Sequence, residues 1–526
     1  MKLKTIPTLI AAALIAAAPA AAQQARPGTL SLSLDECIAR ALRDNLGVAI
    51  QVLGPQISAE GVSQAREKYL PTLSMSARSS KSENAAYSYL DATADSTIAK
   101  ARNYTFLTAS QFLPTGGTLN LNFTGNRNTS NSRGQTINPR YGTTLSFNLT
   151  QPLLKNFGLK INQREILVAR NNLGVSDETL RNTLMTTVFN VESAYWNLIY
   201  SIESLDVRRQ SLQLAKDLLD KNQRSVEVGT LAPIEVLSAQ AEVATREADL
   251  IQAEAQIQSN EDQLKLLLHI TGEEDKATTA LVPKDKPTYV ARQADLEEAL
   301  AAAIENRTDL KIAKYGLETD RLNLGYAKNQ VLPDLSFSAS YSSPGIDGTR
   351  LIYSNNDPIY GDVIDTIPGD IGGALKQTFK MQYPNWNVGL TLSLPLANVF
   401  SRAALAQARL NLRQSMLDLE NQKDQIYVEV KNAVRSVEAN YKRILAYTKA
   451  RELAEQKLAA EEEKRRVGMS TNYMVLSYQR DLANARISEL NAIVSYNISI
   501  AALEKSMGTN LKSKNINFTD YVPERP

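Results

Sequence analysis

The chain alternates between two hydrophobic periods, and the longer one predicts coiled coils. Over residues 160–228, leucine or valine recurs at every seventh position, and the stretch contains no proline. A strict heptad repeat indicates a long α-helix in a left-handed coiled coil. At about 1.5 Å per residue this helix would span roughly 100 Å. A similar seam predicts a second long helix over 400–467. The first seam consists of Leu184, Val191, Leu198, Leu205, Leu212, Leu219 and Val226.

The shorter period is two, and it predicts strands. Leu119, Leu121 and Phe123 alternate with small polar residues, and similar alternation recurs near 145–150, 335–341 and 386–394. One apolar face and one neutral polar face are typical of a membrane strand between lipid and lumen, although a soluble sandwich strand has the same pattern. Four such segments favour the membrane. Four strands cannot close a barrel, and open edges are not tolerated in lipid, so several chains must complete the sheet.

The chain is built from two tandem repeats. Residues 34–77 align without a gap with residues 296–339, and the segment 228–240 recurs at 467–479. Each unit is expected to contain helices, then membrane strands, then a helical hairpin. The predicted divisions are a first repeat at 32–272 (strands about 72–151, hairpin 160–270), a linker at 273–294, a second repeat at 295–509 (strands about 334–396, hairpin 400–507) and a tail at 510–526.

Helix lengths predict a rod in each unit. The hairpins turn at Gly229 and Gly468, and the returning helices, 233–270 and 472–507, are shorter than the long ones. The helices that precede the strands, 46–68 and 308–330, supply the missing length. Laid end to end, two short helices nearly equal one long helix. Each unit is therefore expected to form a rod of constant thickness, with strands at one end and a tight turn at the other.

Composition narrows the functional classes. Residues 1–22 have a basic start, an apolar run and a small-residue end, which predict an export signal. The remaining chain carries 56 basic and 56 acidic residues, because the signal holds two of the 58 lysines and arginines and none of the 56 acids. This balance leaves no excess of positive charge that would attract nucleic acid. The chain has a single cysteine, Cys37, which excludes an intramolecular disulfide. Its single histidine, His269, excludes a multi-histidine metal site and a His-based triad within one chain. We find no catalytic cluster, and expect neither an enzyme nor a cofactor.

These features together resemble the TolC-type outer membrane efflux proteins. The resemblance rests on the signal, the duplicated L-[DE]-E-x-[IL]-A opening, the L-P-x-L start of the strands and the V-G-x-x-x-x-x-x-V-L-S-x-Q turn. It implies a mixed α and β membrane protein, in which a long periplasmic coiled-coil helical barrel joins an oligomeric transmembrane β-barrel. It further implies a homotrimer with a twelve-stranded barrel in outer-membrane lipid. Its implied partners are a periplasmic adaptor and an inner-membrane transporter.

The resemblance places adaptor docking at the two hairpin turns. The expected contacts are Gly229, Thr230, Leu231, Gly468, Met469 and Ser470. The alternative is that both glycines only end helices.

The expected gate is less well matched. The family's gate positions fall on Arg465, Ser470, Met474 and Ser477, and none of these residues matches the family's aromatic, arginine and carboxylate pattern. The first turn keeps a carboxylate, Glu235. We hypothesise a salt-sensitive latch in which Arg465 and Arg466 pair with Glu235 across neighbouring turns. Solvated charge at helix ends is the alternative.

Two questions stay open from the sequence. Residues 81–140 are either an external excursion or an extra strand pair around the turn at 113–117. The leading function is the passive outer-membrane duct of a tripartite efflux or type I secretion system, and the alternative is a soluble periplasmic coiled-coil scaffold. The transported substrate is not encoded in these patterns.

Overall fold

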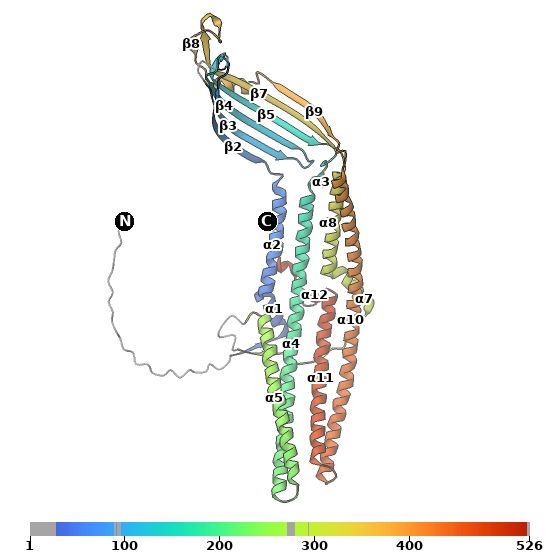
Figure 1. The fold of residues 1–526 in the computed structure, drawn as a ribbon. Helices are drawn as coiled ribbons and strands as arrows, with labels where there is room; N and C mark the ends of the chain where they lie inside the picture. Colours follow the sequence, from blue (N-terminus) through green and yellow to red (C-terminus); the bar gives the residue numbers. More distant parts are fainter. Residues whose placement is uncertain (1–27, 89–90, 92–95, 271–278, 293, 523–526) are drawn as a thin grey trace, which may run out of the picture.

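A computed structural model describes residues 28–88, 91, 96–270, 279–292 and 294–522. The predicted export signal, 1–22, lies outside the described residues. A broad antiparallel sheet stands at one end of the molecule, and long helices run away from it to two tight turns (Figure 1). The helices are α1 (Leu34–Asp44), α2 (Leu46–Glu67), α3 (Leu159–Asn162), α4 (Arg164–Glu227), α5 (Pro233–Leu267), α7 (Leu296–Asn306), α8 (Thr308–Gln330), α9 (Ile371–Phe379), α10 (Val399–Arg466), α11 (Asn472–Ser506) and α12 (Asn510–Ser513), with short 3₁₀ turns η1 (Ser354–Asn356) and η2 (Phe518–Tyr521).

Two rods are built from long helices backed by pairs of shorter ones. Helix α4 has 64 residues, and α2 with 22 and α5 with 35 lie one above the other along it (Figure 1). In the second rod, α8 and α11 lie along the 68 residues of α10 in the same way. Contacts of α4 with α8 and α11 join the rods side by side. The near equality of lengths keeps each rod two helices thick.

The heptad seam forms the core of the first rod. Leu184, Val191 and Leu198 are fully buried, and they lie in one cluster with Cys37 and Leu42 of α1. Full burial of such side chains contributes about 1.5–3 kcal/mol each, so the seam supplies much of the rod's stability. In the second rod, the buried seam residues are Ile426, Val430, Val437 and Ile444, and they pack against Tyr496.

The segment between the repeats is a strap across the rods. Strand β6 (Ala280–Pro283) pairs in parallel with β1 (Thr29–Leu32). Beyond β6, the Oη of Tyr195 on α4 donates to Asp285 at 2.7 Å, and the Oη of Tyr496 on α11 donates to the carbonyl of Val290 at 3.0 Å. The strap therefore fastens both rods at the same height.

The main sheet contains six long strands. Their order is β2 (Thr72–Ala85), β3 (Ser96–Phe112), β4 (Thr118–Ser130), β5 (Ile137–Pro152), β7 (Asp334–Tyr353) and β9 (Asn385–Ser393), all antiparallel. The short β8 (Val363–Ile367) pairs with the outer end of β7, on the edge that β9 occupies further in. Directly paired residues share a face, so Leu121, Phe147, Tyr341 and Trp386 form one apolar row.

Residues 81–140 are mostly strand, which settles the first open question. The turn between β3 and β4 lies at the helical end of the sheet, because Thr115 Oγ1 bonds Gln151 Oε1 at 2.8 Å and the amide of Gly158 donates to the Thr115 carbonyl at 3.1 Å. Strands β3 and β4 therefore run the height of β5. The expectation of four strands per chain was too low. A twelve-stranded barrel from three copies is wrong for this chain, since three copies of six long strands supply eighteen.

A short helix covers part of the apolar face. Helix α9 packs on β5 and β7, where Thr378 bonds the hydroxyl of Thr143 at 2.7 Å. Gly345 allows this approach, because a Cβ there would lie 2.0 Å from the carbonyl oxygen of Ala374. Among the helices in the described part of the chain, none is long and apolar enough to cross a membrane.

Cys37 provides a test of this packing. Burial, with Glu36 and then Asp285 nearby, raises the pKa of its thiol to about 12. The thiolate is the reactive form. We expect the native protein to resist a maleimide at mildly alkaline pH and to react promptly once unfolded in denaturant. Mass spectrometry of the labelled chain measures this, and rapid labelling of native protein would contradict the packing of α1 on α4.

Candidate docking turns and periplasmic entrance

The two hairpin turns have the same backbone geometry. Gly229 and Gly468 adopt φ values of 78° and 81°, in the left-handed region that favours glycine. After Gly229, the amide of Thr230 donates to the Ser225 carbonyl at 2.9 Å, and after Gly468 the amide of Met469 donates to the Lys464 carbonyl at 2.9 Å. These bonds satisfy carbonyls at the ends of α4 and α10. The glycines therefore end helices whether or not they also dock a partner.

Apolar side chains are exposed at both turns. Met469 is 78 % exposed, whereas Leu231 is partly buried. Thr230 is fixed by its own hydroxyl, which bonds the Ser225 carbonyl at 2.9 Å. Exposed apolar groups gathered at a tip are typical of a protein-binding surface. We name this set the tip residues, and the sequence analysis missed most of them: Val228, Ile234, Leu237, Val467, Met469 and Tyr473.

The residues of the hypothesised latch are not brought together within the chain. Glu235 is half-buried in the first turn of α5, and Arg466 forms an ion pair with Glu463 on its own helix. Arg465 is also half-buried. Among the described residues, no ion pair joins Glu235 to either arginine. Ser470 serves a different role, because its hydroxyl donates to buried Glu461 at 2.5 Å.

Arg246 ties the first hairpin to the second near the turns. This residue of α5 is 5 % exposed. Its guanidinium donates to the carbonyl of Ser211 on α4 at 3.0 Å, to the carbonyl of Leu476 on α11 at 3.2 Å and to Glu242 at 2.9 Å. Carbonyl bonds from α5 to two other helices, α4 and α11, make Arg246 a cross-brace. A lone arginine among polar neighbours gives no signal of this role in sequence.

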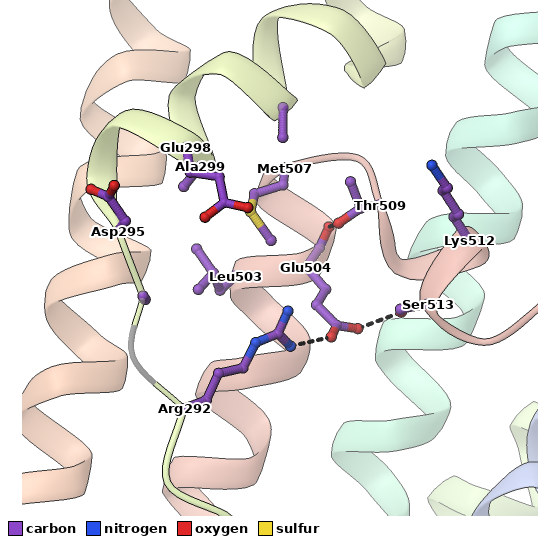
Figure 2. Close-up of a pocket in the computed structure, with 12 residues that line it drawn as sticks. Arg292, Asp295, Glu298, Ala299, Leu503, Glu504, Met507, Thr509, Lys512 and Ser513 are labelled. Carbon is purple, nitrogen blue, oxygen red and sulfur yellow. Dashed lines mark hydrogen bonds and ion pairs between the residues drawn. The ribbon is translucent and has the colours of Figure 1, made fainter.

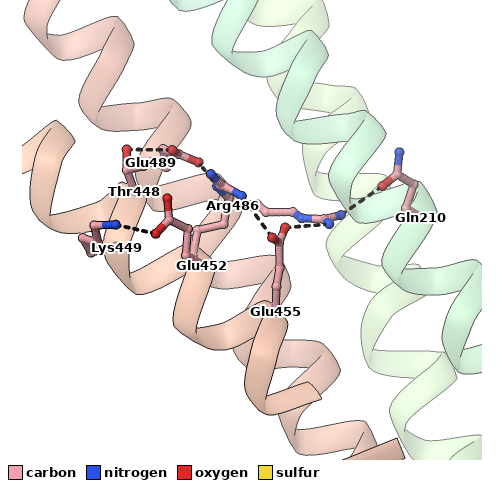
Figure 3. Close-up of polar contacts among 8 residues, drawn as sticks. Gln210, Thr448, Lys449, Glu452, Glu455, Arg486 and Glu489 are labelled. Atoms are coloured by element: carbon pink, nitrogen blue, oxygen red, sulfur yellow. Dashed lines mark hydrogen bonds and ion pairs between the residues drawn. The ribbon is translucent and has the colours of Figure 1, made fainter. Parts of the chain in front are cut away.

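A second set of contacts lies further up the same hairpins, and Figure 3 shows it. Arg486 of α11 pairs with Glu455 of α10 at 3.1 Å and reaches Gln210 of α4 at 3.4 Å. Arg451 pairs with Glu489 at 2.6 Å and with Glu455 at 3.1 Å. Three helices therefore share one charged cluster. The hydrogen bond from Arg486, and then the contacts of Arg451, lower the pKa of Glu455.

A polar pocket lies at the level of the strap, and Figure 2 shows its lining residues. Its volume is about 430 Å³, between the strap, α7 and the end of α11. Glu504 accepts from Arg292 at 2.7 Å and from Ser513 at 2.6 Å. These bonds fasten the strap and the C-terminal tail to α11. We therefore interpret the residues around the pocket as structural contacts rather than a ligand site. Within the described part of the chain, no group of three or more His, Cys, Asp or Glu is placed to hold a metal ion.

Comparisons with known proteins agree with this architecture. The family described as "Outer membrane efflux protein" matches residues 92–268 and 299–509. Outer membrane protein TolC of Escherichia coli (strain K12) is 25 % identical over 378 residues, which cover 70 % of this chain and 69 % of TolC. Outer membrane efflux protein BepC of Brucella suis is 22 % identical over 399 residues, covering 75 % of this chain and 78 % of BepC.

A solved structure extends the likeness across the fold. The CmeC outer membrane channel of Campylobacter jejuni aligns with a TM-score of 0.63 and 15 % identity, over 93 % of this chain and 90 % of CmeC. The two family matches cover both repeats and more than half of the chain. The protein is therefore an outer-membrane channel, in which the sheet is the membrane part and the rods with their turns are the periplasmic helical extension. The chain belongs to the outer membrane efflux protein family, as an outer-membrane exit duct.

Proposed function

We propose that three copies of this chain form the exit duct of a tripartite efflux or type I secretion system. The duct conducts substrates passively from an inner-membrane transporter to the outside, and a periplasmic adaptor binds its hairpin turns. The observation that carries the proposal is a sheet with two open edges, β2 and β9, joined to rods that end in exposed turns. The soluble scaffold does not explain the six strands or their apolar face.

The open edges require further copies of the sheet. All fourteen residues of β2 are exposed, and β9 is exposed except at Gly389. In lipid, unpaired backbone groups cost several kcal/mol each, so β2 of one copy must pair with β9 of the next. Eighteen long strands then form the wall. Barrels of 16–18 strands leave an aqueous channel, so the width suits passive conduction.

The tip residues support adaptor docking. They are apolar, exposed and located at the end of the rods furthest from the sheet (Figure 1). Burial of each large apolar side chain in a partner's surface contributes about 1.5–3 kcal/mol. Gly229, Thr230, Leu231, Gly468, Met469 and Ser470 are proposed to shape the two turns so that the tip residues meet the adaptor.

Cross-linking tests the shared wall. Single cysteines at Ser74 or Ser76 of β2 are combined with one at Asn387 or Thr391 of β9, all on the polar face. We expect at least one pair to join neighbouring copies and to give a ladder that ends at three chains in denaturing electrophoresis. The control pairs Asn120→Cys, on the central strand β4, with Asn387→Cys and should give no ladder. A ladder that ends at another number, or a detergent-extracted monomer in native mass spectrometry, would contradict the trimer.

We further propose that Arg246 and Arg486 hold the entrance closed, because α11 cannot move away from α4 and α5 without breaking their contacts. Removal of one member of a buried charge pair costs about 3–5 kcal/mol. Arg246→Ala should therefore raise the conductance of single channels in planar bilayers. Arg321→Ala is the control, since Arg321 pairs only with Glu318 of its own helix α8 among the described contacts. Unchanged conductance in Arg246→Ala with a correctly assembled trimer would refute the cross-brace.

The latch between Glu235 of one copy and Arg465 or Arg466 of the next is a separate proposal for the same entrance. Glu235→Gln distinguishes the two, because Glu235 does not contact Arg246 or Arg486 through its side chain in the described structure. A rise in conductance at low salt that disappears at high salt would support the latch. Conductance equal to that of the unmodified channel at both salt concentrations would rule it out.

The charged cluster in Figure 3 predicts a pH dependence. The pKa of Glu455 is lowered in the folded protein, so its stabilising contribution is present above the ordinary carboxyl pKa and is lost as pH falls through the lower folded value. We expect channel opening to become more frequent as the pH falls below about 4. Glu455→Gln should open more often at neutral pH and respond less to acid. An acid response identical to that of the unmodified channel would exclude Glu455 as its source.

A further inference from the structure

The outer end of the sheet carries opposed basic residues on its apolar face. Arg102 of β3 is paired directly with Arg127 of β4, and Lys81 of β2 is paired directly with Lys100 of β3. Directly opposite residues in an antiparallel sheet project from the same face, and like charges in such positions destabilise the pair. Two like-charged pairs lie in alternate rows of three neighbouring strands. This arrangement calls for a negative counterpart.

Contacts fix the face on which these side chains lie. Arg127 is placed over the ring of Tyr141 at 5.8 Å, and its Nε donates to the Tyr141 hydroxyl at 3.3 Å. In the preceding row of that face, Tyr104 stacks on Phe106, which packs on Phe123. Phe123 belongs to the apolar alternation of β4. The basic pairs therefore continue the face that carries the leucines and phenylalanines.

The protein itself neutralises this charge only in part. Lys81 pairs with Glu83 on its own strand at 2.7 Å. Among the described residues, no carboxylate forms an ion pair with Lys100, Arg102 or Arg127. Asp347 is in the same row as Arg127, but β5 separates them, and the carboxylate of Asp347 lies against Gly373 at the start of α9.

The position along the strands matches a membrane boundary. On β7 the apolar face runs from Leu335 to Gly345, and about ten residues at a tilt of roughly 40° rise about 25 Å. That is the height of the outward apolar band in such barrels. The row of Gly345 contains Tyr104, and the next row on this face contains Arg102, Arg127 and Tyr141. Tyrosines followed by cations are expected where acyl chains give way to headgroups.

Helix α9 runs along β7 from the row of Asp347, which is also the row of Arg127, towards Tyr341, which contacts Met381 just after the helix. It lies on the apolar face beside Thr143, and Phe379 at its end packs on Phe123 with ring centroids 5.5 Å apart. Lys376 and Lys380 are exposed, as is Phe379. The start of α9 therefore lies at the level of the basic rows, and the helix covers the apolar face below them.

We propose that Lys100, Arg102 and Arg127 form a binding site for the phosphate groups of an anionic lipid in the outer leaflet. Arginine binds phosphate oxygens in a bidentate fashion, and two adjacent guanidinium groups match a phosphorylated headgroup whose acyl chains lie along the apolar rows below. The bound phosphate offsets the repulsion between Arg102 and Arg127. The inference rests on the outer-membrane location and holds whether or not the trimer or the gate is as proposed.

Lipid retention tests the site. The full chain is reconstituted in nanodiscs of phosphatidylcholine containing bis-phosphorylated lipid A, and bound lipid is counted by native mass spectrometry. We expect the unmodified protein to retain lipid A and the double variant Arg102→Gln/Arg127→Gln to retain it about tenfold less. The matched control is Arg78→Gln/Arg140→Gln, which removes two arginines from neighbouring rows of the polar face and should retain lipid A normally. Oligomeric mass confirms that each variant is assembled.

Four results would overturn the proposal. Equal retention by Arg102→Gln/Arg127→Gln and the unmodified protein would exclude these arginines. An equal loss in the control variant would indicate general charge attraction rather than a site. Retention of phosphatidylcholine at the same level as lipid A would show that phosphate charge is not recognised. Displacement of lipid A by millimolar inorganic phosphate would reduce the site to an adventitious anion site.

Discussion

The unpaired backbone of β2 and β9 is the constraint on which the rest of the architecture depends. A backbone amide or carbonyl facing hydrocarbon has no water to bind, so a sheet in lipid must close. Six strands cannot close around a channel, and closure therefore has to come from other copies. Because β2, β5, β7 and β9 connect to helices at the inner end of the sheet, as Leu70-Pro71 leads from α2 into β2, the closure of the sheet fixes the spacing of the rods beneath it. In the proposed trimer, a wall of eighteen strands instead of twelve would set the rods on a wider ring where they leave the sheet.

Helix length keeps the thickness of each rod constant. Helices α2 and α5 together match α4, so the rod keeps one thickness from the sheet to the turns. The strap carries Asp285 and Val290 to tyrosines on both rods at one height, and it holds the two rods of the chain together there. Below it, the rods are joined by fewer apolar contacts and more arginines. Polar groups therefore join the two rods in the segment between the strap and the turns, which is the segment proposed to move when the entrance opens.

Much of this fold can be predicted from the sequence, and the elements that cannot be predicted have physical reasons. The heptad repeats predict α4 and α10 because their apolar seams are buried against other helices of the same chain. Gly229 and Gly468 predict the turns because the backbone there has a positive φ, which glycine adopts without strain. Strands β2 and β3 were not among the four predicted segments, because β2 is rich in serine on both faces and because a bulge between Thr105 and Leu107 in β3 breaks the period of two. Arg246 was missed for a different reason. Its partners are backbone carbonyls of other helices, and backbone carbonyls leave no mark on sequence.

The division between leucine seams and arginine ties also determines how the entrance can open. A buried leucine contributes about 1.5–3 kcal/mol, whereas an ordinary hydrogen bond contributes about 0.5–1.5 kcal/mol because water replaces it. Opening that separated α4 from α5, or α10 from α11, would expose many seam residues at once. Opening that moved the α10–α11 hairpin as a unit would break the contacts of Arg246 and Arg486, expose Leu476, and leave both seams packed. The second route costs far less, so we expect each hairpin to move as a rigid body and its arginines to determine the free-energy cost of opening.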